Sequence, residues 1–212
     1  MSNALIESAV VSKTINDLNA AHKEYVNAVN GLQGDIDELS NYIVDGEVKG
    51  LFDKLCSSLN EQNPNIDKST ISIGNNLRSN AQVMLSKTQM SYSLPAVDES
   101  RTKPILNSID DAQSKARAGW KNLEQAQQLI DNVDKRFTSI NNANNKMKKA
   151  TSSNVGLDLG SYESLFNSAS GQIGTDVEES QLKYRDAMKR VLSEEFEAYK
   201  DIVSKAETST KG

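Results

Sequence analysis

The chain has 212 residues, a formal net charge of −5 and a single cysteine, Cys56. One cysteine excludes an intrachain disulfide, and Lys and Arg dispersed among Asp and Glu disfavour nucleic acid and anionic membranes as partners. The chain opens without the cationic and apolar regions of a secretory signal peptide, and it lacks a run of about 18 apolar residues, so stable membrane insertion is not expected.

The first predicted element is a helix from about Ala4 to Val44. Three prolines in the whole chain and many Ala, Leu, Lys and Glu residues favour helices. Apolar or aromatic residues recur here alternately three and four residues apart, which predicts a helix lying along a partner helix. This seam consists of Ile15, Leu18, His22, Tyr25, Val29, Leu32, Ile36, Leu39 and Ile43. A turn at Asn30-Gly31 is the alternative.

A turn at Val44-Asp45-Gly46 is expected to end this helix, because Asp-Gly favours turns and the apolar phase restarts at Val48. A second amphipathic helix should then run to about Asn60, so that residues 4–61 form a helical hairpin. Pro64 predicts a loop at Asn63-Pro64-Asn65, since a proline disfavours helix at the residue before it.

Three more helices are predicted along the rest of the chain. One covers 71–92 and is followed by a linker from Ser93 to Lys103. A long helix over 104–150 begins with Pro104 in its first turn. A loop from Ala150 to Ser161 leads to a last helix over 162–206, with possible breaks at its glycines Gly171 and Gly174.

The helix over 104–150 repeats the heptad pattern of the first one. Its stripe consists of Ile109, Ala112, Ala116, Gly119, Leu123, Ala126, Ile130, Val133, Phe137, Ile140, Asn144 and Met147. Asn144 occupies a core-type position, where it could fix the helix register. A solvated helix end is the interpretation we favour for it.

The last helix has apolar residues on two faces, which indicates two neighbours or a dimer. One stripe is Val177, Tyr184, Met188, Val191, Ala198 and Ile202, and the other is Leu182, Leu192, Phe196, Tyr199 and Val203. The candidate partner-facing residues are Trp120, Leu192, Phe196, Tyr199 and Val203. Trp is common in binding hot spots, although packing beside the seam is the interpretation we favour for Trp120. The sequence as a whole predicts an all-α fold, a single elongated domain over 1–212 of long antiparallel helices with coiled-coil-like seams.

Histidine and cysteine, two residue types that often carry catalysis or bind metals, occur once each. His22 is the only histidine, which excludes the paired Glu-x-x-His motifs of a di-iron bundle, and packing is its expected role. Cys56 has Leu55 and Leu59 as neighbours on the predicted helix, which indicates a small buried residue. The glycines match no nucleotide-binding spacing. We therefore expect no catalytic, metal or cofactor site, no small-molecule substrate and no enzyme activity.

The segment around Val44-Asp45-Gly46 resembles the helical hairpins of type VII secretion substrates. In that family a turn with Trp-x-Gly or, in LXG domains, Leu-x-Gly joins two antiparallel amphipathic helices. Val44 and Gly46 match the motif positions here, with Val in place of the large residue, and Val48, Phe52 and Leu55 fall where the second helix has its core residues. The resemblance covers about residues 5–60 and implies secretion without a signal peptide.

The same resemblance implies small helical partners. The family's export signal is an aromatic residue followed four positions later by an acid. No Tyr or Phe of this sequence has an acid at that distance, so a partner would have to supply the signal. We therefore predict a non-enzymatic protein–protein interaction module that binds helical partners or itself. The alternatives are a cytoplasmic coiled-coil scaffold, chaperone or phage structural protein and, less favoured because charges interrupt every apolar window, a helical pore-forming protein.

Overall fold

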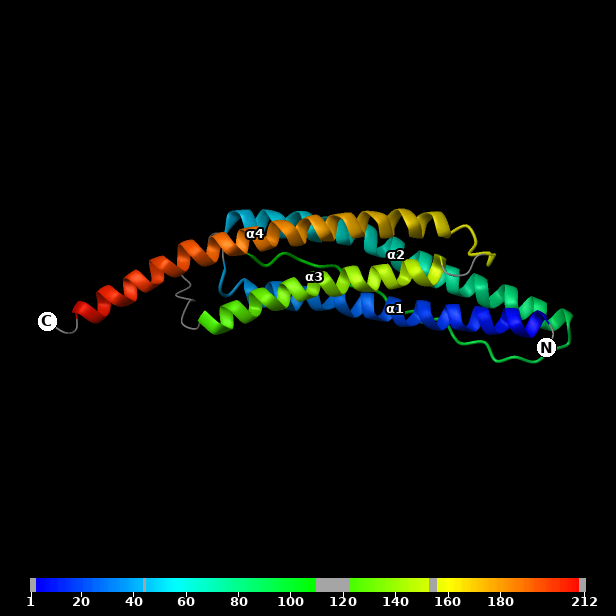
Figure 1. The fold of residues 1–212 in the computed structure, drawn as a ribbon. Coiled ribbons are helices and arrows are strands. Elements are labelled where there is room, and N and C mark those ends of the chain that lie inside the picture. Colours follow the sequence, from blue (N-terminus) through cyan, green and yellow to red (C-terminus); the bar gives the residue numbers. More distant parts are fainter. Residues whose placement is uncertain (1–2, 44, 110–122, 153–155, 210–212) are drawn as a thin grey trace.

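Four long helices make up the fold. The computed structural model describes residues 3–43, 45–109, 123–152 and 156–209, and it describes side chains only from Gln125 in the third helix and up to Glu194 in the last. The helices are α1 (Asn3–Leu39), α2 (Gly46–Lys87), α3 (Leu123–Ser152) and α4 (Glu163–Ser209) (Figure 1). The described residues contain no strand, so the predicted all-α class is confirmed.

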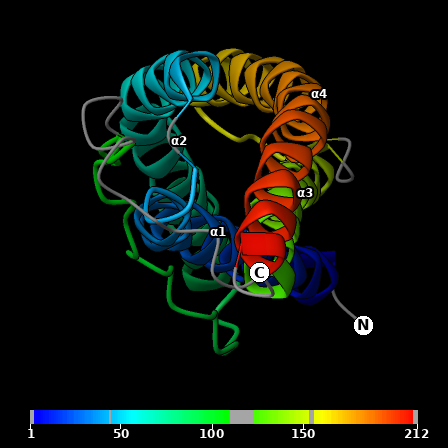
Figure 2. The ribbon, with the colours of Figure 1, turned by 90° about the vertical axis from the view of Figure 1, so that its left-hand side faces the viewer.

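The helices form an elongated bundle in which each helix has two neighbours. α1 packs on α2 and α3, and α4 also packs on α2 and α3, which puts α1 and α4 on one diagonal (Figure 2). Neighbouring helices run antiparallel, whereas α2 and α3 run parallel (Figure 1). The chain must therefore return along the bundle between α2 and α3, a topology with one long crossover.

The heptad seams form the core. Every residue of the predicted α1 seam is buried, as are the described members of the α3 seam from Ala126 to Met147. Phe52, Phe137 and Tyr184 bring α2, α3 and α4 together, with ring centroids 5.5–6.3 Å apart. The seams thus close within one chain, and their burial is the main stabilisation of the bundle.

The turn between the first two helices lies close to its predicted place, although α1 ends earlier than expected. α1 ends at Leu39 instead of Val44, and the backbone N–H of Ile43 still bonds the Leu39 carbonyl at 2.9 Å. The Ser40 hydroxyl donates to the Asp37 carbonyl, and such side-chain bonds compete with further helix. Ile43 nevertheless remains buried in the core.

α2 contradicts the predicted loop at Asn63-Pro64-Asn65 and the separate helix over 71–92. It is one continuous helix through Pro64 to Lys87. A proline inside a helix costs about 3 kcal/mol. Packing overrides this local cost, because Leu59 and Ile66 on either side are fully buried and Asn63 accepts a hydrogen bond from Tyr25.

The start of the predicted helix 104–150 is also wrong. Residues 104–109 do not form a helix, while 110–122 lie outside the described residues, as do the stripe positions Ala112, Ala116 and Gly119. The segment 88–109, here called the strap, turns at 88–89 and then runs along α1 and α2 without forming helix or strand (Figure 2). Ile105 and Ile109 of the strap are buried in the core.

Side-chain amides of the two helices hold the strap backbone. Asn60 of α2 pairs with both backbone groups of Ile105, each at 2.8 Å. Asn19 of α1 donates to the Ala96 carbonyl and accepts from the Asp98 N–H. Val97 sits against Gly74, where a Cβ would lie 3.0 Å from its methyl groups. These long-range bonds replace the helical bonds that residues 104–109 would otherwise make.

The remaining boundaries follow the predictions more closely. The loop between α3 and α4 lies within a few residues of its predicted place, and α4 continues through Gly171 and Gly174 without a break. Asn144 is buried and not solvated, which corrects our preferred interpretation. Its amide donates to the Ser170 carbonyl at 2.8 Å, and the Ser170 hydroxyl donates to its oxygen at 2.6 Å.

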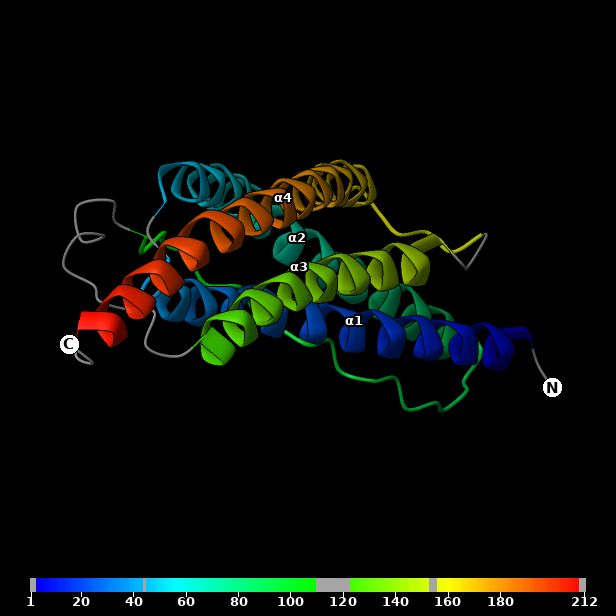
Figure 3. The same cartoon turned by 60° about the vertical axis from the view of Figure 1, so that its left-hand side comes forward.

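The two ends of the bundle are staggered. At one end α1 and α2 reach past α3 and α4, and at the opposite end α4 reaches past the other described helices (Figures 1 and 3). This stagger leaves helix faces at both ends without a neighbour among the described residues.

Candidate functional site

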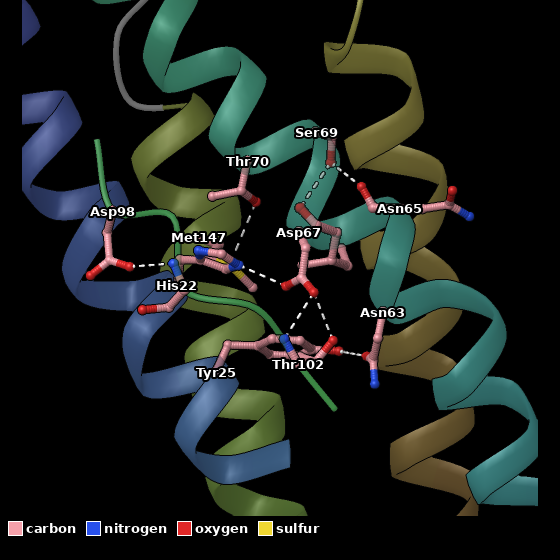
Figure 4. Close-up of polar contacts among 12 residues, drawn as sticks. His22, Tyr25, Asn63, Asn65, Asp67, Ser69, Thr70, Asp98, Thr102 and Met147 are labelled. Carbon is pink, nitrogen blue, oxygen red and sulfur yellow. Dashed lines mark hydrogen bonds and ion pairs between the residues drawn. The ribbon is translucent and has the colours of Figure 1, made fainter. Parts of the chain in front are cut away.

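The buried polar cluster around His22 is the first place to look for chemistry. The His22 Nε2 lies 2.9 Å from the Asp67 carboxylate, and both side chains are almost inaccessible to solvent. The other Asp67 oxygen accepts from the backbone N–H and the hydroxyl of Thr102 in the strap, at 2.9 and 2.7 Å. Figure 4 shows these residues meeting between α1, α2 and the strap.

This cluster binds the strap instead of preparing a nucleophile. The Thr102 hydroxyl donates to Asp67, so it is not hydrogen-bonded to the histidine that would have to activate it. Beside it, Tyr25 donates to Asn63 at 2.6 Å, and burial, followed by the charge of Asp67, raises the pKa of Tyr25 well above its usual value. The arrangement cross-links three segments through polar groups.

Cys56 is likewise a buried packing residue. Burial raises the pKa of its thiol to about 12, and the nearby charge of Asp53 adds to this effect. A thiol with so high a pKa is protonated at neutral pH and is a poor nucleophile. The described residues contain no group of His, Cys, Asp and Glu side chains that could hold a metal ion.

The predicted turn motif is held by an ion pair to α4. Asp45 is the N-cap of α2 and accepts hydrogen bonds from the backbone N–H groups of Glu47 and Val48. Arg190 of α4 bonds both Asp45 oxygens at 3.0 Å and Glu47 at 2.9 Å. Gly46 begins α2 and Val44 lies outside the described residues. The motif-like turn therefore anchors the point where α4 leaves the bundle.

The electrostatics of Asp45 agree with this anchoring role. Burial raises the pKa of its carboxyl, but the Val48 N–H and the Arg190 guanidinium outweigh that effect, and the net pKa lies below the usual value. The carboxylate is therefore charged and paired at neutral pH. It links the start of α2 to α4 across the bundle end.

The candidate partner-facing residues lie mostly at the α4 end, by which we mean residues 192–209. Leu192 is half-buried and packs on the core. Phe196, Tyr199 and Val203 belong to the helical backbone of α4, but their side chains lie outside the described part of the structure. Trp120 also lies outside it, so its predicted role is not tested. Leu182 of the same predicted stripe is exposed.

Sequence reasoning missed the residues that organise these contacts. Arg190 gave no signal, because one Arg on a helix face is ordinary. Asn19 and Asn60, whose side-chain amides hold the strap, could not be told apart in the sequence from the many other Asn residues. A buried stripe leaves a period in the sequence, whereas a bond between a side chain and a distant backbone group leaves none.

The fold and these surfaces define an elongated all-α four-helix bundle with one projecting helix end. No protein-family model matches the chain, and no curated protein or solved structure matches it either. In the described part of the chain, none of the helices is long and apolar enough to cross a membrane.

Proposed function

We propose that this protein is a non-enzymatic helical interaction module whose α4 end binds a helical protein partner. The observation that carries the proposal is the continuation of α4 beyond Arg190, where the bundle ends, to Ser209. This part of α4 is about 28 Å long at the rise of an α-helix. In its sequence Leu192, Phe196, Tyr199 and Val203 recur at heptad spacing.

A projecting helix with such a stripe favours a helical partner on energetic grounds. Most of the stability of a helix in a protein comes from the packing of its amphipathic face and not from helix propensity. Burying a large apolar side chain contributes about 1.5–3 kcal/mol. A partner helix that covers the stripe would supply both the packing and the apolar burial.

The interior of the bundle supports the absence of enzyme activity. His22, Asp67 and Cys56 are buried and engaged in packing or in holding the strap. A catalytic group must reach its substrate, and these groups have no solvent-exposed surface to offer one. We propose neither a cofactor nor a small-molecule substrate.

We further propose that the module is linked to type VII secretion, by its resemblance to LXG-like targeting domains. Support comes from the antiparallel α1–α2 hairpin and from the Asp45 cap at its turn. On this proposal the protein is secreted without a signal peptide, and its small helical partner supplies the export signal.

Co-expression with small helical proteins encoded beside its gene tests the partner proposal. The wild-type chain should co-purify with such a protein in a fixed ratio. Phe196→Asp with Val203→Asp should abolish co-purification, because charges replace the apolar stripe. Leu182→Asp is the matched control, since Leu182 is exposed on α4 within the bundle, and it should bind normally. Undiminished binding by the double variant would reject the α4 end as the docking element.

The secretion proposal needs a separate readout. Export into the medium should require both the secretion system and the partner. If the protein stays inside cells under conditions in which its partner is exported, the cytoplasmic scaffold or chaperone alternative is favoured.

A further inference from the structure

The end of the bundle opposite the α4 end exposes apolar residues. There α1 and α2 reach past α3 and α4, and we call residues 3–12 and 76–87 the open hairpin end (Figure 1). Ile6, Val10 and Val83 of this end are 50%, 39% and 52% exposed. They are half of the large apolar residues exposed in the described chain, the others being Tyr92, Leu106 and Leu182.

These residues continue helix faces that are covered elsewhere in the bundle. Val10 precedes Glu24 and Gly31 by whole heptads, so all three lie on one face of α1. In the bundle that face meets α3, where Lys146 pairs with Glu24 at 2.6 Å and Arg136 covers Gly31. Val10 thus lies where α3 would pack if α3 were longer.

Val83 stands in the same relation to α4. It follows Asn76 by one heptad, and the Asn76 amide donates to the Asp158 carbonyl just before α4 begins. The open hairpin end therefore has the packing faces of a four-helix bundle but only two of its helices. Exposed apolar faces of this kind mark interaction surfaces.

We propose that the α4 end of a second copy of this chain packs on the open hairpin end. This inference rests on the proposed function of the α4 end and names its partner. A copy shifted along the bundle axis brings its α4 end to the open hairpin end of its neighbour. The incoming helix then runs antiparallel to α2, as α4 does within the chain (Figures 1 and 3).

The charges of the two surfaces favour this pairing. Residues 192–209 contain five acidic residues (Glu194, Glu195, Glu197, Asp201 and Glu207) and two basic ones (Lys200 and Lys205). The open hairpin end contains Arg78 and Lys87 against one acid, Glu7.

Charge also disfavours the symmetric alternatives. Two open hairpin ends would bring like positive charges together, and two α4 ends would bring like negative charges together. The contact we propose is heterologous, because the α4 end of one copy packs on a different surface, the open hairpin end, of the next copy. A heterologous contact that does not close into a ring generates an open series of copies.

Complementation between two variants tests the proposal. The receiver variant combines Val10→Asp with Val83→Asp, one on each helix of the open hairpin end, and the donor variant combines Phe196→Asp with Val203→Asp. Sedimentation velocity should show a wild-type mass that rises with concentration past the dimer. Each variant alone should be monomeric, since it lacks one surface. An equal mixture should form a one-to-one pair and stop there, because each variant supplies the surface that the other lacks.

Controls distinguish the proposed contact from misfolding of a variant and from a symmetric interface. Leu182→Asp should assemble like wild type, and circular dichroism should show native helix content for every variant. Val83→Asp alone is a second receiver variant, should the first fail to fold. If either variant dimerises alone, the interface is symmetric, and if the mixture stays monomeric, the proposal is overturned.

The proposed function can survive this failure. A wild-type chain that stays monomeric at all concentrations, yet co-purifies with a helical partner through its α4 end, overturns self-assembly alone. Loss of both binding activities overturns both proposals. Added salt should weaken the self-association, because opposite charges face each other across the contact.

Discussion

At the scale of single residues, polar side chains in the core select the helix register. Asn144 pairs with Ser170 across α3 and α4, and Tyr25 pairs with Asn63 across α1 and α2. A buried polar group without a partner costs about 1–3 kcal/mol. Sliding one helix along another would break these pairs, whereas apolar seam residues would find similar neighbours after a slide of one heptad.

Asp45 gives the sharpest test at this scale. Asp45→Asn should keep the N-cap, since Asn also caps helices well, but lose the ion pair with Arg190. We expect a loss of about 0.5–1 kcal/mol in the free energy of unfolding at pH 7, because the pair is partly exposed. Urea unfolding of both proteins measures it. Glu179→Gln removes an exposed contact to Lys183 and should change little.

The same variant predicts a pH dependence. The pKa of Asp45 is lowered on folding, so its stabilisation is complete above the ordinary Asp pKa of about 3.9. It is lost as the pH falls through the lowered pKa of the folded state. The difference between wild type and Asp45→Asn should therefore vanish in acid, and a constant difference down to pH 2 would contradict this assignment.

At the scale of elements, the long-range contacts of α2 override its local sequence preference. Pro64 is exposed in the helix interior and cannot donate a hydrogen bond to the Asn60 carbonyl. The helix persists because its other face packs on α1 and α4 and because Asn60 itself holds the strap. A local penalty of a few kcal/mol is small beside the burial of a whole apolar stripe.

Replacing this proline should stabilise the protein. Pro64→Ala restores a helical N–H at an exposed position, and it also gives the unfolded chain more freedom, which offsets part of the gain. We expect a net increase of about 1–2 kcal/mol in the free energy of unfolding. Ser57→Ala, at an exposed site of the same helix, controls for helix propensity. A decrease with Pro64→Ala would mean that the helix needs the proline.

At the scale of the whole molecule, the stagger of the helices divides the bundle into a stabilising core and two ends, the α4 end and the open hairpin end, that we propose to be binding surfaces. The described core contacts of α4 end with Val191 and Leu192, just after Arg190 and its ion pair with Asp45. The α4 end should therefore contribute little to folding and much to association. Stability and binding then reside in different parts of the same helix.

Truncation after Glu194 tests this separation. The shortened chain should keep its melting temperature within about 2 °C, because the seams and the Arg190 pair remain. It should also lose self-association and partner binding. Differential scanning calorimetry measures the melting temperature. A large fall on truncation would show that the α4 end packs against its own bundle.

Much of the fold was predictable because apolar periodicity is a local signal. The α1 seam and the α3 stripe from Ala126 onward were predicted and are buried. The candidate site was predictable only in part. The heptad stripe of the α4 end was visible in the sequence, but its projection beyond the bundle depends on where α1, α2 and α3 end.

The sequence by itself determined the helical class, the faces that form the core and the turn near Asp45. Spacing along one helix is enough to specify which face must leave water. Only the tertiary structure decided that Pro64 lies inside a helix, that residues 104–109 belong to the strap and that Asn144 is buried. Each of these depends on a partner far away in the chain, such as Asn60 for Ile105, and contacts of that kind outweigh local preference.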